Sequence, residues 1–213
     1  MLVTKYEHAA LVVEVDGQRL VIDPGGFTRP LTDVTDVEGI VITHQHPDHW
    51  TPGQIEGLLE ANPGARILGP EGVAHALGEV GFAVETVSDG DVVEVGPFTL
   101  RFAGTDHAVI HETLPRVDNT GVLVNDTLFH PGDSYTVPPF DVPVLAAPIG
   151  APWLKIGEAM DYAAAVKPGR AFPIHEKTLS ETGLGMHVDR IRAVVEAAGG
   201  DVVVLAPGES LEL

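Results

Sequence analysis

The stretch Gly39–His49, GIVITHQHPDH, places a short apolar run directly before four side chains that can bind metal. The residues GIVIT predict a buried strand, and the run His44-Gln45-His46-Pro47-Asp48-His49 follows it as a loop. Three histidines and an aspartate in this pattern should arise by chance in about one of a thousand such chains. Because a proline lies within the loop, the four side chains can point in different directions and serve two adjacent ions.

Three further candidate ligands lie far along the chain, each directly after a predicted strand. His107 follows FTLRFAGTD, Asp133 follows TLFHPG and His175 follows RAFPI. Ligands at strand ends are held by a rigid sheet, while the loops beyond them can shape a pocket for substrate. We therefore expect the seven side chains to converge on one site.

The order of these seven residues resembles the metallo-β-lactamase superfamily over nearly the whole chain. The resemblance implies that one ion is held by His44, His46 and His107, a second by Asp48, His49 and His175, and that Asp133 bridges both. In the motif LVIDPGG, it also implies that Asp23 supports the loop of ligands without binding metal. The segments HAVIHETLPRVDNTG and LFHPGDSYTVP look closest to bacterial proteins related to ascorbate-6-phosphate lactonase.

The expected chemistry is hydrolysis that depends on two divalent ions. Such a pair can share a water, lower its pKa and present hydroxide to an ester, lactone, amide or phosphodiester. Asp48 or Asp133 would orient this hydroxide or move its proton, which makes them the catalytic candidates. Imidazole and carboxylate ligands suit zinc best, with manganese and iron as alternatives.

The pattern of strands and helices agrees with the fold that the resemblance implies. A strand is expected over 5–15, and the turns Asp16-Gly17 and Asn125-Asp126 predict two hairpins. Strands in two groups, each followed by helices, predict two packed sheets with helices outside. The expected fold class is α/β (α+β): a four-layer αββα sandwich of two mixed β-sheets with helices on the outer faces. Near the C-terminus we expect a helix over 188–198 and a strand over 202–205. Residues 1–213 should form one hydrolase domain, because this length suits one core.

Composition limits the partners. The net charge of −19, from 31 acidic and 12 basic residues, opposes binding of long nucleic acids. Cysteine is absent, so thiolate ligands are excluded. No run approaches the roughly 20 apolar residues that cross a bilayer, and the first ten residues do not look like a signal peptide. We expect a cytoplasmic protein that acts on a small molecule, without a membrane partner and with homo-oligomerisation left open.

Other polar residues are candidates for contacting substrate. Five of them lie in loops expected near the metals: His111, Arg116, Tyr135, Trp153 and Lys155. Packing is the alternative for the tryptophan, and solvation is the alternative for the two cations. The remaining histidines are expected to be structural or on the surface: His8, His75, His130 and His187. Of these, His130 is the nearest to an exception, because it lies three residues before Asp133.

The favoured function is hydrolysis of a small ester-like substrate, such as a lactone or a phosphorylated sugar lactone. One alternative is a phosphodiesterase acting on a small nucleotide, which would use the same metal ions. Another is a non-catalytic binding protein whose metals only stabilise the fold. The complete ligand set disfavours the last alternative, because structural sites normally close the coordination sphere and leave no room for water.

Overall fold

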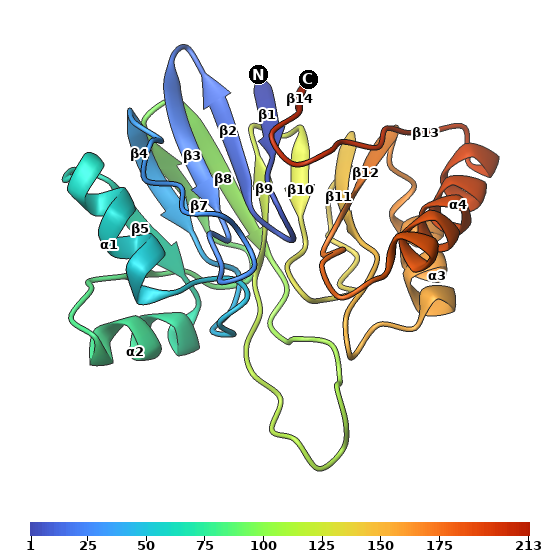
Figure 1. Ribbon diagram of the computed structural model, residues 1–213, viewed down its shortest axis with the longest axis horizontal. Coiled ribbons are helices and arrows are strands. Elements are labelled where there is room, and N and C mark those ends of the chain that lie inside the picture. Colours follow the sequence, from blue (N-terminus) through green and yellow to red (C-terminus); the bar gives the residue numbers. More distant parts are fainter.

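The computed structural model describes residues 1–213, whose strands form two seven-stranded β-sheets packed face to face (Figure 1). In spatial order, the first sheet contains β14 (Ser210–Glu212), β1 (Leu2–Lys5), β2 (Leu11–Val15), β3 (Gln18–Ile22), β4 (Val37–Val41), β5 (Arg66–Gly69) and β6 (Glu85–Thr86). The second sheet contains β13 (Asp201–Val202), β12 (Arg170–Ile174), β11 (Val144–Pro148), β10 (Leu128–His130), β9 (Gly121–Val124), β8 (Phe98–Ala103) and β7 (Val92–Val95). Both sheets are mixed, with antiparallel pairing in one half and parallel pairing in the other.

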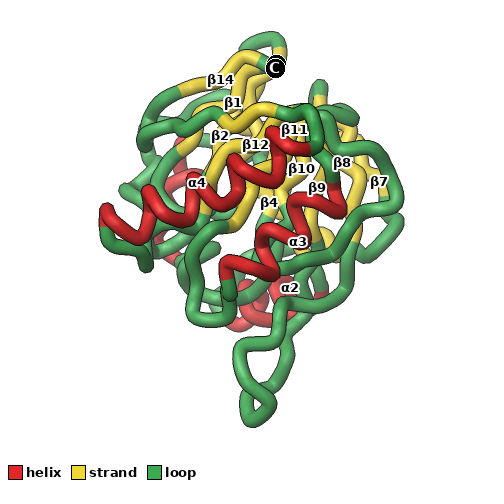
Figure 2. Tube along the Cα trace, turned by 90° about the vertical axis from the view of Figure 1, so that its right-hand side faces the viewer, coloured by secondary structure: helices red, strands yellow, loops and turns green.

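Four helices cover the outer faces of the two sheets. The first sheet is covered by α1 (Pro52–Ala61) and α2 (Glu71–Glu79), and the second by α3 (Ile156–Val166) and α4 (Glu181–Ala197). Figure 2 shows α3 and α4 side by side across the second sheet. No helix in the molecule has the length and apolar composition that a membrane crossing requires.

Three buried apolar clusters hold the four layers together. One fills the space between the sheets, and each of the others joins a sheet to its own pair of helices. Neighbouring residues of β3 show the alternation, because Leu20 and Ile22 face the other sheet while Val21 faces the helices. Both faces of each sheet are therefore buried, which explains the nearly continuous apolar strands. The expected αββα sandwich is confirmed.

A turn interrupts the strand that was expected over 5–15 and divides it into β1 and β2. The Tyr6 amide donates to the Ala10 carbonyl at 2.9 Å, and the Ala10 amide donates to the Glu7 carbonyl at 3.3 Å. His8 lies within this turn in the left-handed region, with φ of 63°. The expectation of one strand was wrong because the buried apolar run continues through the turn, from Ala9 to Val13, and conceals it.

The C-terminal region also differs from expectation. Helix α4 begins seven residues earlier than expected, at Glu181, after Ser180 accepts a capping hydrogen bond from the Gly183 amide at 3.1 Å. Two glycines in its first turns, Gly183 and Gly185, lower the helix propensity and hide this start. The strand expected over 202–205 is reduced to β13, and β14 pairs with β1, which brings the two termini together (Figure 1).

Candidate metal centre

The candidate site lies at one end of the sandwich, and its residues follow the carboxyl ends of six strands. In the first sheet β1, β3 and β4 run in the same direction, and in the second sheet β8, β10 and β12 do so. Their carboxyl ends therefore lie at a common edge of each sheet. The side chains that follow these ends and meet in the site are His8, Asp23, His44, His46, Asp48, His49, His107, Asp133 and His175.

One cluster of donor atoms combines three imidazoles with one carboxylate oxygen. His44 Nε2 lies 3.1 Å from His46 Nδ1. Asp133 Oδ2 lies 3.4 Å from His107 Nε2 and 4.0 Å from His44 Nε2. This is the set that the family resemblance implies for the first ion.

The second cluster combines two imidazoles with two carboxylates. Asp133 Oδ1 lies 3.0 Å from His175 Nε2 and 3.2 Å from His49 Nε2, and the two imidazole nitrogens are 3.2 Å apart. Asp48 Oδ2 completes the group at 3.6 Å from His175 Nε2 and 3.9 Å from His49 Nε2. This is the set predicted for the second ion.

The spacing of these atoms fits a pair of cations. Bonds of about 2.0–2.1 Å to a tetrahedral ion place its ligand atoms about 3.3–3.4 Å from one another. The separations in the two clusters, from 3.0 to 4.0 Å, scatter around that value. In addition, His107 Nε2 in the first cluster and Asp133 Oδ1 in the second are buried without a hydrogen-bond partner, which is costly unless each of them binds a cation. The donors could therefore hold two ions, with the two oxygens of Asp133 facing one each.

Neighbouring oxygens orient four of the imidazoles. A histidine that binds metal through Nε2 usually donates its Nδ1 proton to a second partner, which fixes the tautomer and the ring. In each case Nδ1 faces such an oxygen: Thr43 Oγ1 for His44, Asp23 Oδ2 for His49, the Ala108 carbonyl for His107 and the Gly150 carbonyl for His175. The four Nε2 lone pairs are left to point inward.

Asp23 holds the loop of ligands in place through hydrogen bonds. Its fully buried carboxylate accepts from the Thr43 amide and the Thr43 hydroxyl, both at 2.8 Å, and from His49 Nδ1 at 2.7 Å. The Thr43 hydroxyl in turn faces His44 Nδ1 at 3.1 Å. Asp23 thus reaches a ligand of each cluster through its hydrogen bonds, and none of its contacts places it between the donor atoms.

The electrostatics of the site favour cations. Burial acts to raise the pKa of Asp133, but His49 and His175 hold it well below its usual range. Burial acts to lower the pKa of His49, yet the carboxylates of Asp133 and Asp23 raise it well above the ordinary value. Burial and the nearby imidazoles lower the pKa of His44 and His46. The same environment therefore favours the neutral form of those two rings, which is the form that binds metal.

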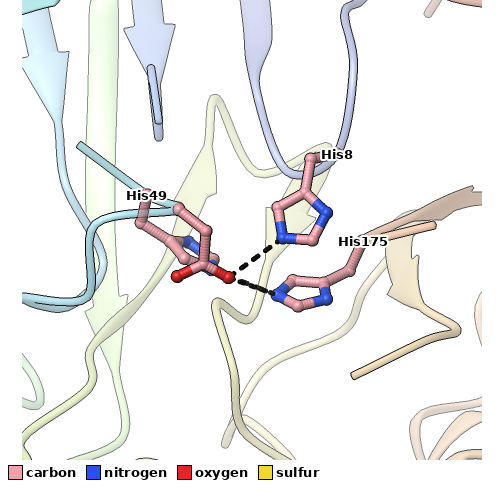
Figure 3. Close-up of side chains that lie close together, drawn as sticks. His8, His49 and His175 are labelled. Atoms are coloured by element: carbon pink, nitrogen blue, oxygen red, sulfur yellow. Dashed lines mark hydrogen bonds and ion pairs between the residues drawn. The ribbon is translucent and has the colours of Figure 1, made fainter. Parts of the chain in front are cut away.

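His8 belongs to this site, contrary to the expectation that it is a structural residue of a strand. It is fully buried, and its Nε2 lies 3.1 Å from Asp48 Oδ2 (Figure 3). The expectation was wrong because the turn at residues 6–10 carries His8 past the end of β1. No motif in the sequence marks this histidine, so only the break in the strand pattern could have revealed it.

The other three histidines lie outside the two clusters. His130 is buried, and backbone groups occupy both of its ring nitrogens: Nε2 donates to the Ala9 carbonyl at 2.9 Å and Nδ1 accepts from the Gly132 amide at 3.1 Å. His75 is exposed on α2. His187 lies within α4, not at its start as expected, and contacts the Ile149 carbonyl. Their structural or surface assignment is confirmed.

Two cavities adjoin His107 and share Arg116 as a lining residue. The smaller, of about 200 Å³, is also lined by His46, His111 and the apolar side chains of residues 108–117. Residues 108–117 belong to the long loop between β8 and β9, which extends beyond the sheets in both views (Figure 1, Figure 2). The larger cavity, of about 370 Å³, is also lined by Tyr135 and Trp153.

Four of the five predicted substrate residues therefore line a cavity beside the donor clusters, and Lys155 lines neither of the two. Trp153 has a further contact, because its Nε1 donates to Asp133 Oδ2 at 2.7 Å. Trp153 is also buried, so this residue both packs in the core and contacts the candidate site.

Comparison with known proteins identifies the family of this chain. The family described as the beta-lactamase superfamily domain matches residues 2–175. The chain is 40% identical over 196 residues to protein Rv0786c of Mycobacterium tuberculosis, covering 90% of this chain and 91% of that protein. It is 27% identical over 227 residues to a UPF0173 metal-dependent hydrolase of Methanocaldococcus jannaschii, covering 100% of each.

Solved structures share the fold. Igni18, described as a novel metallo hydrolase from the archaeon Ignicoccus hospitalis, has a TM-score of 0.76 at 23% identity and covers 100% of this chain and 98% of that one. CmlA, described as a diiron β-hydroxylase from Streptomyces venezuelae, has a TM-score of 0.78 at 16% identity and covers 100% of this chain but 54% of that one. The family match over residues 2–175, together with these relatives, shows that the chain belongs to the metallo-β-lactamase superfamily of metal-dependent hydrolases.

Proposed function

We propose that this protein is a dinuclear hydrolase that cleaves a small ester-like substrate with a water held between two divalent ions. The observation that carries the proposal is the placement of the Asp133 carboxylate. One oxygen lies 3.0 Å from His175 Nε2, and the other lies 3.4 Å from His107 Nε2, so that a single side chain faces both donor clusters.

The residues of the site divide the remaining work. When bound, the two ions would acidify a shared water and stabilise negative charge that develops on the substrate. Asp133 is buried and accepts from Trp153 Nε1, which keeps its two oxygens directed at the two clusters. The Asp48 side chain is 22% exposed, so we assign to its carboxylate the orientation of the water and the passage of its proton toward solvent.

Zinc is the proposed resident metal. The donors are five imidazoles and two carboxylates, and their spacing suits the four-coordinate geometry that zinc prefers with these ligands. CmlA, which shares the fold, is described as a diiron enzyme, so iron is the competing choice together with manganese. Metal analysis of the purified protein separates these choices.

The proposed substrate is a lactone or another small ester that carries an anionic group. The cavity beside His46 and His107 has apolar walls, which suit the hydrocarbon part of such a molecule. Arg116 lines both cavities and supplies a permanent positive charge for a carboxylate or phosphate. A phosphorylated sugar lactone fits the same requirement for an ester next to an anion.

The experiment measures metal content and activity together. Metal per chain is determined for the wild type and for His46→Ala, and both are assayed with lactones, thioesters, phosphodiesters and β-lactams. His75→Ala is the matched control, because it removes an exposed histidine that lies outside the donor clusters. We expect about two ions per wild-type chain and a hydrolase activity that chelation abolishes and metal restores.

The outcomes separate the alternatives. Loss of activity in His46→Ala, with His75→Ala unchanged, supports the proposed centre. Hydrolysis that survives complete chelation contradicts it. Preference for phosphodiesters over lactones would assign the same ions to a small-nucleotide phosphodiesterase. Two bound ions with no hydrolysis of any of these substrate classes would favour the metal-stabilised binding protein.

A further inference from the structure

His8 is not one of the seven candidate ligands, but its side chain forms a hydrogen bond to one of them, Asp48 of the second cluster. Its Nε2 lies 3.1 Å from Asp48 Oδ2, and its ring lies against that of His175, with centroids 3.7 Å apart. Figure 3 shows both rings directed at the same carboxylate oxygen. The Phe27 ring also packs edge-on with the His8 ring, with centroids 5.0 Å apart.

We propose that His8 is a positioning residue that holds Asp48 in the second donor cluster through an Nε2–H hydrogen bond. The inference rests on the proposed function, because it assigns a role within the same metal centre. Among the four ligands of the second cluster, Asp48 is the one that solvent reaches: its side chain is 22% exposed, whereas the other three are at most 3% exposed. A carboxylate at the surface loses conformational freedom when it is held in one orientation, and a fixed donor reduces that loss on metal binding.

The His8 ring lies close enough to Asp48, His49 and His175 to share an ion with them, but its surroundings favour donation of a proton over binding of metal. The four imidazoles that present Nε2 to the clusters each have an oxygen opposite Nδ1. In contrast, His8 Nδ1 is buried and has no hydrogen-bond partner. If Nε2 bound an ion, the proton would have to reside on Nδ1, where no acceptor receives it. With the proton on Nε2, the hydrogen bond to Asp48 is made, and the Nδ1 lone pair is the one group of the ring left unpaired.

The backbone of His8 is locked to the strand end that carries His175. The His175 amide donates to the His8 carbonyl at 2.8 Å, and both residues lie in the left-handed region, with φ of 63° for His8 and 64° for His175. The His8 amide donates to Glu176 Oε1 at 3.2 Å. The buried Lys5 ammonium also binds Glu176 Oε1, at 2.8 Å, and ties this carboxylate to the end of β1. Strained backbone persists where its surroundings determine it, and such sites are commonly functional.

The test compares two substitutions of His8 that differ in one property. His8→Phe keeps a buried ring but removes the donor, whereas His8→Gln places an amide N–H close to the position of Nε2. Histidine tolerates the positive φ of this position better than either replacement, so the two variants are compared with each other as well as with the wild type. Binding of Zn²⁺ to the metal-free protein is followed by calorimetry, and Co²⁺ absorption spectra report the two sites separately. His75→Phe is the control for the same chemical change on the surface.

For His8→Phe we expect one ion to bind as in the wild type and the second to bind about 10- to 100-fold more weakly. His8→Gln should recover most of this affinity, and His75→Phe should match the wild type. In an Asp48→Asn background, His8→Phe should have little further effect on the second ion, because the two side chains act as a unit.

Three results would overturn the proposal. Wild-type affinity for both ions in His8→Phe would show that the hydrogen bond does not matter. Equal weakening of both ions would indicate a general structural role. Failure of folded His8→Gln to recover the second ion would remove the hydrogen bond as the cause, and it would do so even if His8→Phe does not fold. These results differ from failure of the proposed function, in which the wild type itself binds fewer than two ions or lacks hydrolase activity.

Discussion

Gly25 lies so close to the backbone of Asp48 that no side chain fits between them. A methyl group built on Gly25 would overlap the Asp48 carbonyl and lie 2.6 Å from the His49 amide nitrogen. The neighbouring Gly26 amide donates to the Pro47 carbonyl at 2.9 Å. The two glycines after β3 therefore pack directly against the backbone of the loop that carries the metal ligands and support it.

Replacing Gly25 with alanine should displace this loop. Because the clash involves backbone atoms, rotation of a side chain cannot relieve it, and we expect Gly25→Ala to lower the free energy of unfolding by about 3 kcal/mol or more. Metal content should fall with it. Gly53→Ala is the control, because Gly53 is an exposed residue of α1 with open space around it, and it should change stability by less than about 1 kcal/mol. Denaturant unfolding and metal analysis measure both effects; a Gly25→Ala protein with wild-type stability and metal content would contradict the close approach.

Removing the charge of Asp23 should weaken the second ion site. Its carboxylate accepts hydrogen bonds from Thr43 and from His49 Nδ1 without being exposed. In Asp23→Asn one oxygen becomes an NH2 group, which faces a donor and leaves it unpaired. We expect the free energy of unfolding to fall by about 3 kcal/mol and the affinity for the second ion to fall about 10- to 100-fold.

The control for this prediction is Asp33→Asn, which makes the same change at an exposed residue and should leave both quantities within error. The two quantities are followed by urea unfolding of the metal-free protein and by calorimetric metal titration. Wild-type metal affinity in Asp23→Asn would mean that His49 does not need this partner.

The seven candidate ligands were predictable because strand ends constrain where side chains can be. His44 and His175 are far apart in sequence and follow strands of different sheets, yet each lies shortly after an apolar strand that ends at the same end of the sandwich. The hairpin turns were predictable for a similarly local reason. Asn125 and Asp126 both adopt positive φ, 49° and 48°, which these residue types tolerate and a two-residue turn requires.

The role of His8 could not be predicted, because it depends on contacts between distant segments. Its left-handed backbone is held by His175 and Glu176, which lie more than 160 residues later. Local sequence reports only an apolar run, which is typical of one long strand. The early start of α4 was missed because Gly183 and Gly185 lower the helix propensity of its first turns. The helix forms there despite this, because Val188 and Ile191 of the same helix pack in the core and stabilise it.

The contact between Trp153 and Asp133 predicts a change in catalysis with little loss of structure. In Trp153→Phe the ring remains, but Asp133 Oδ2 loses a hydrogen bond of 2.7 Å. We expect kcat to fall about 10- to 100-fold and the free energy of unfolding to fall by about 1 kcal/mol. Trp50→Phe is the matched control, because Trp50 is also buried but donates to the Gln45 carbonyl at 2.9 Å and not to a candidate ligand. Equal effects of the two substitutions on kcat would show that the contact with Asp133 has no special role.

Arg116 and Lys155 should differ in their effect on an anionic substrate. Arg116 lines both cavities beside His107, and its ion pair with Asp106 is long, at 3.8 Å, and exposed, so an anionic substrate group could compete with Asp106 for the guanidinium. Lys155 precedes α3 and lines neither cavity. We expect Arg116→Ala to raise KM for an ester with a carboxylate or phosphate about 5- to 30-fold, which corresponds to about 1–2 kcal/mol of binding, and to leave metal content intact.

Lys155→Ala should change KM for the same substrate less than about twofold, because an exposed charge outside the pocket contributes little. Steady-state kinetics on a charged ester and on its neutral analogue measure the difference for each variant. Arg116→Lys should recover part of the affinity for the charged ester, since it keeps the charge but loses the planar pair of donors. An unchanged KM in Arg116→Ala for both esters would remove this residue from the pocket, and an equal loss for both would assign it to the shape of the loop instead of to recognition of the anion.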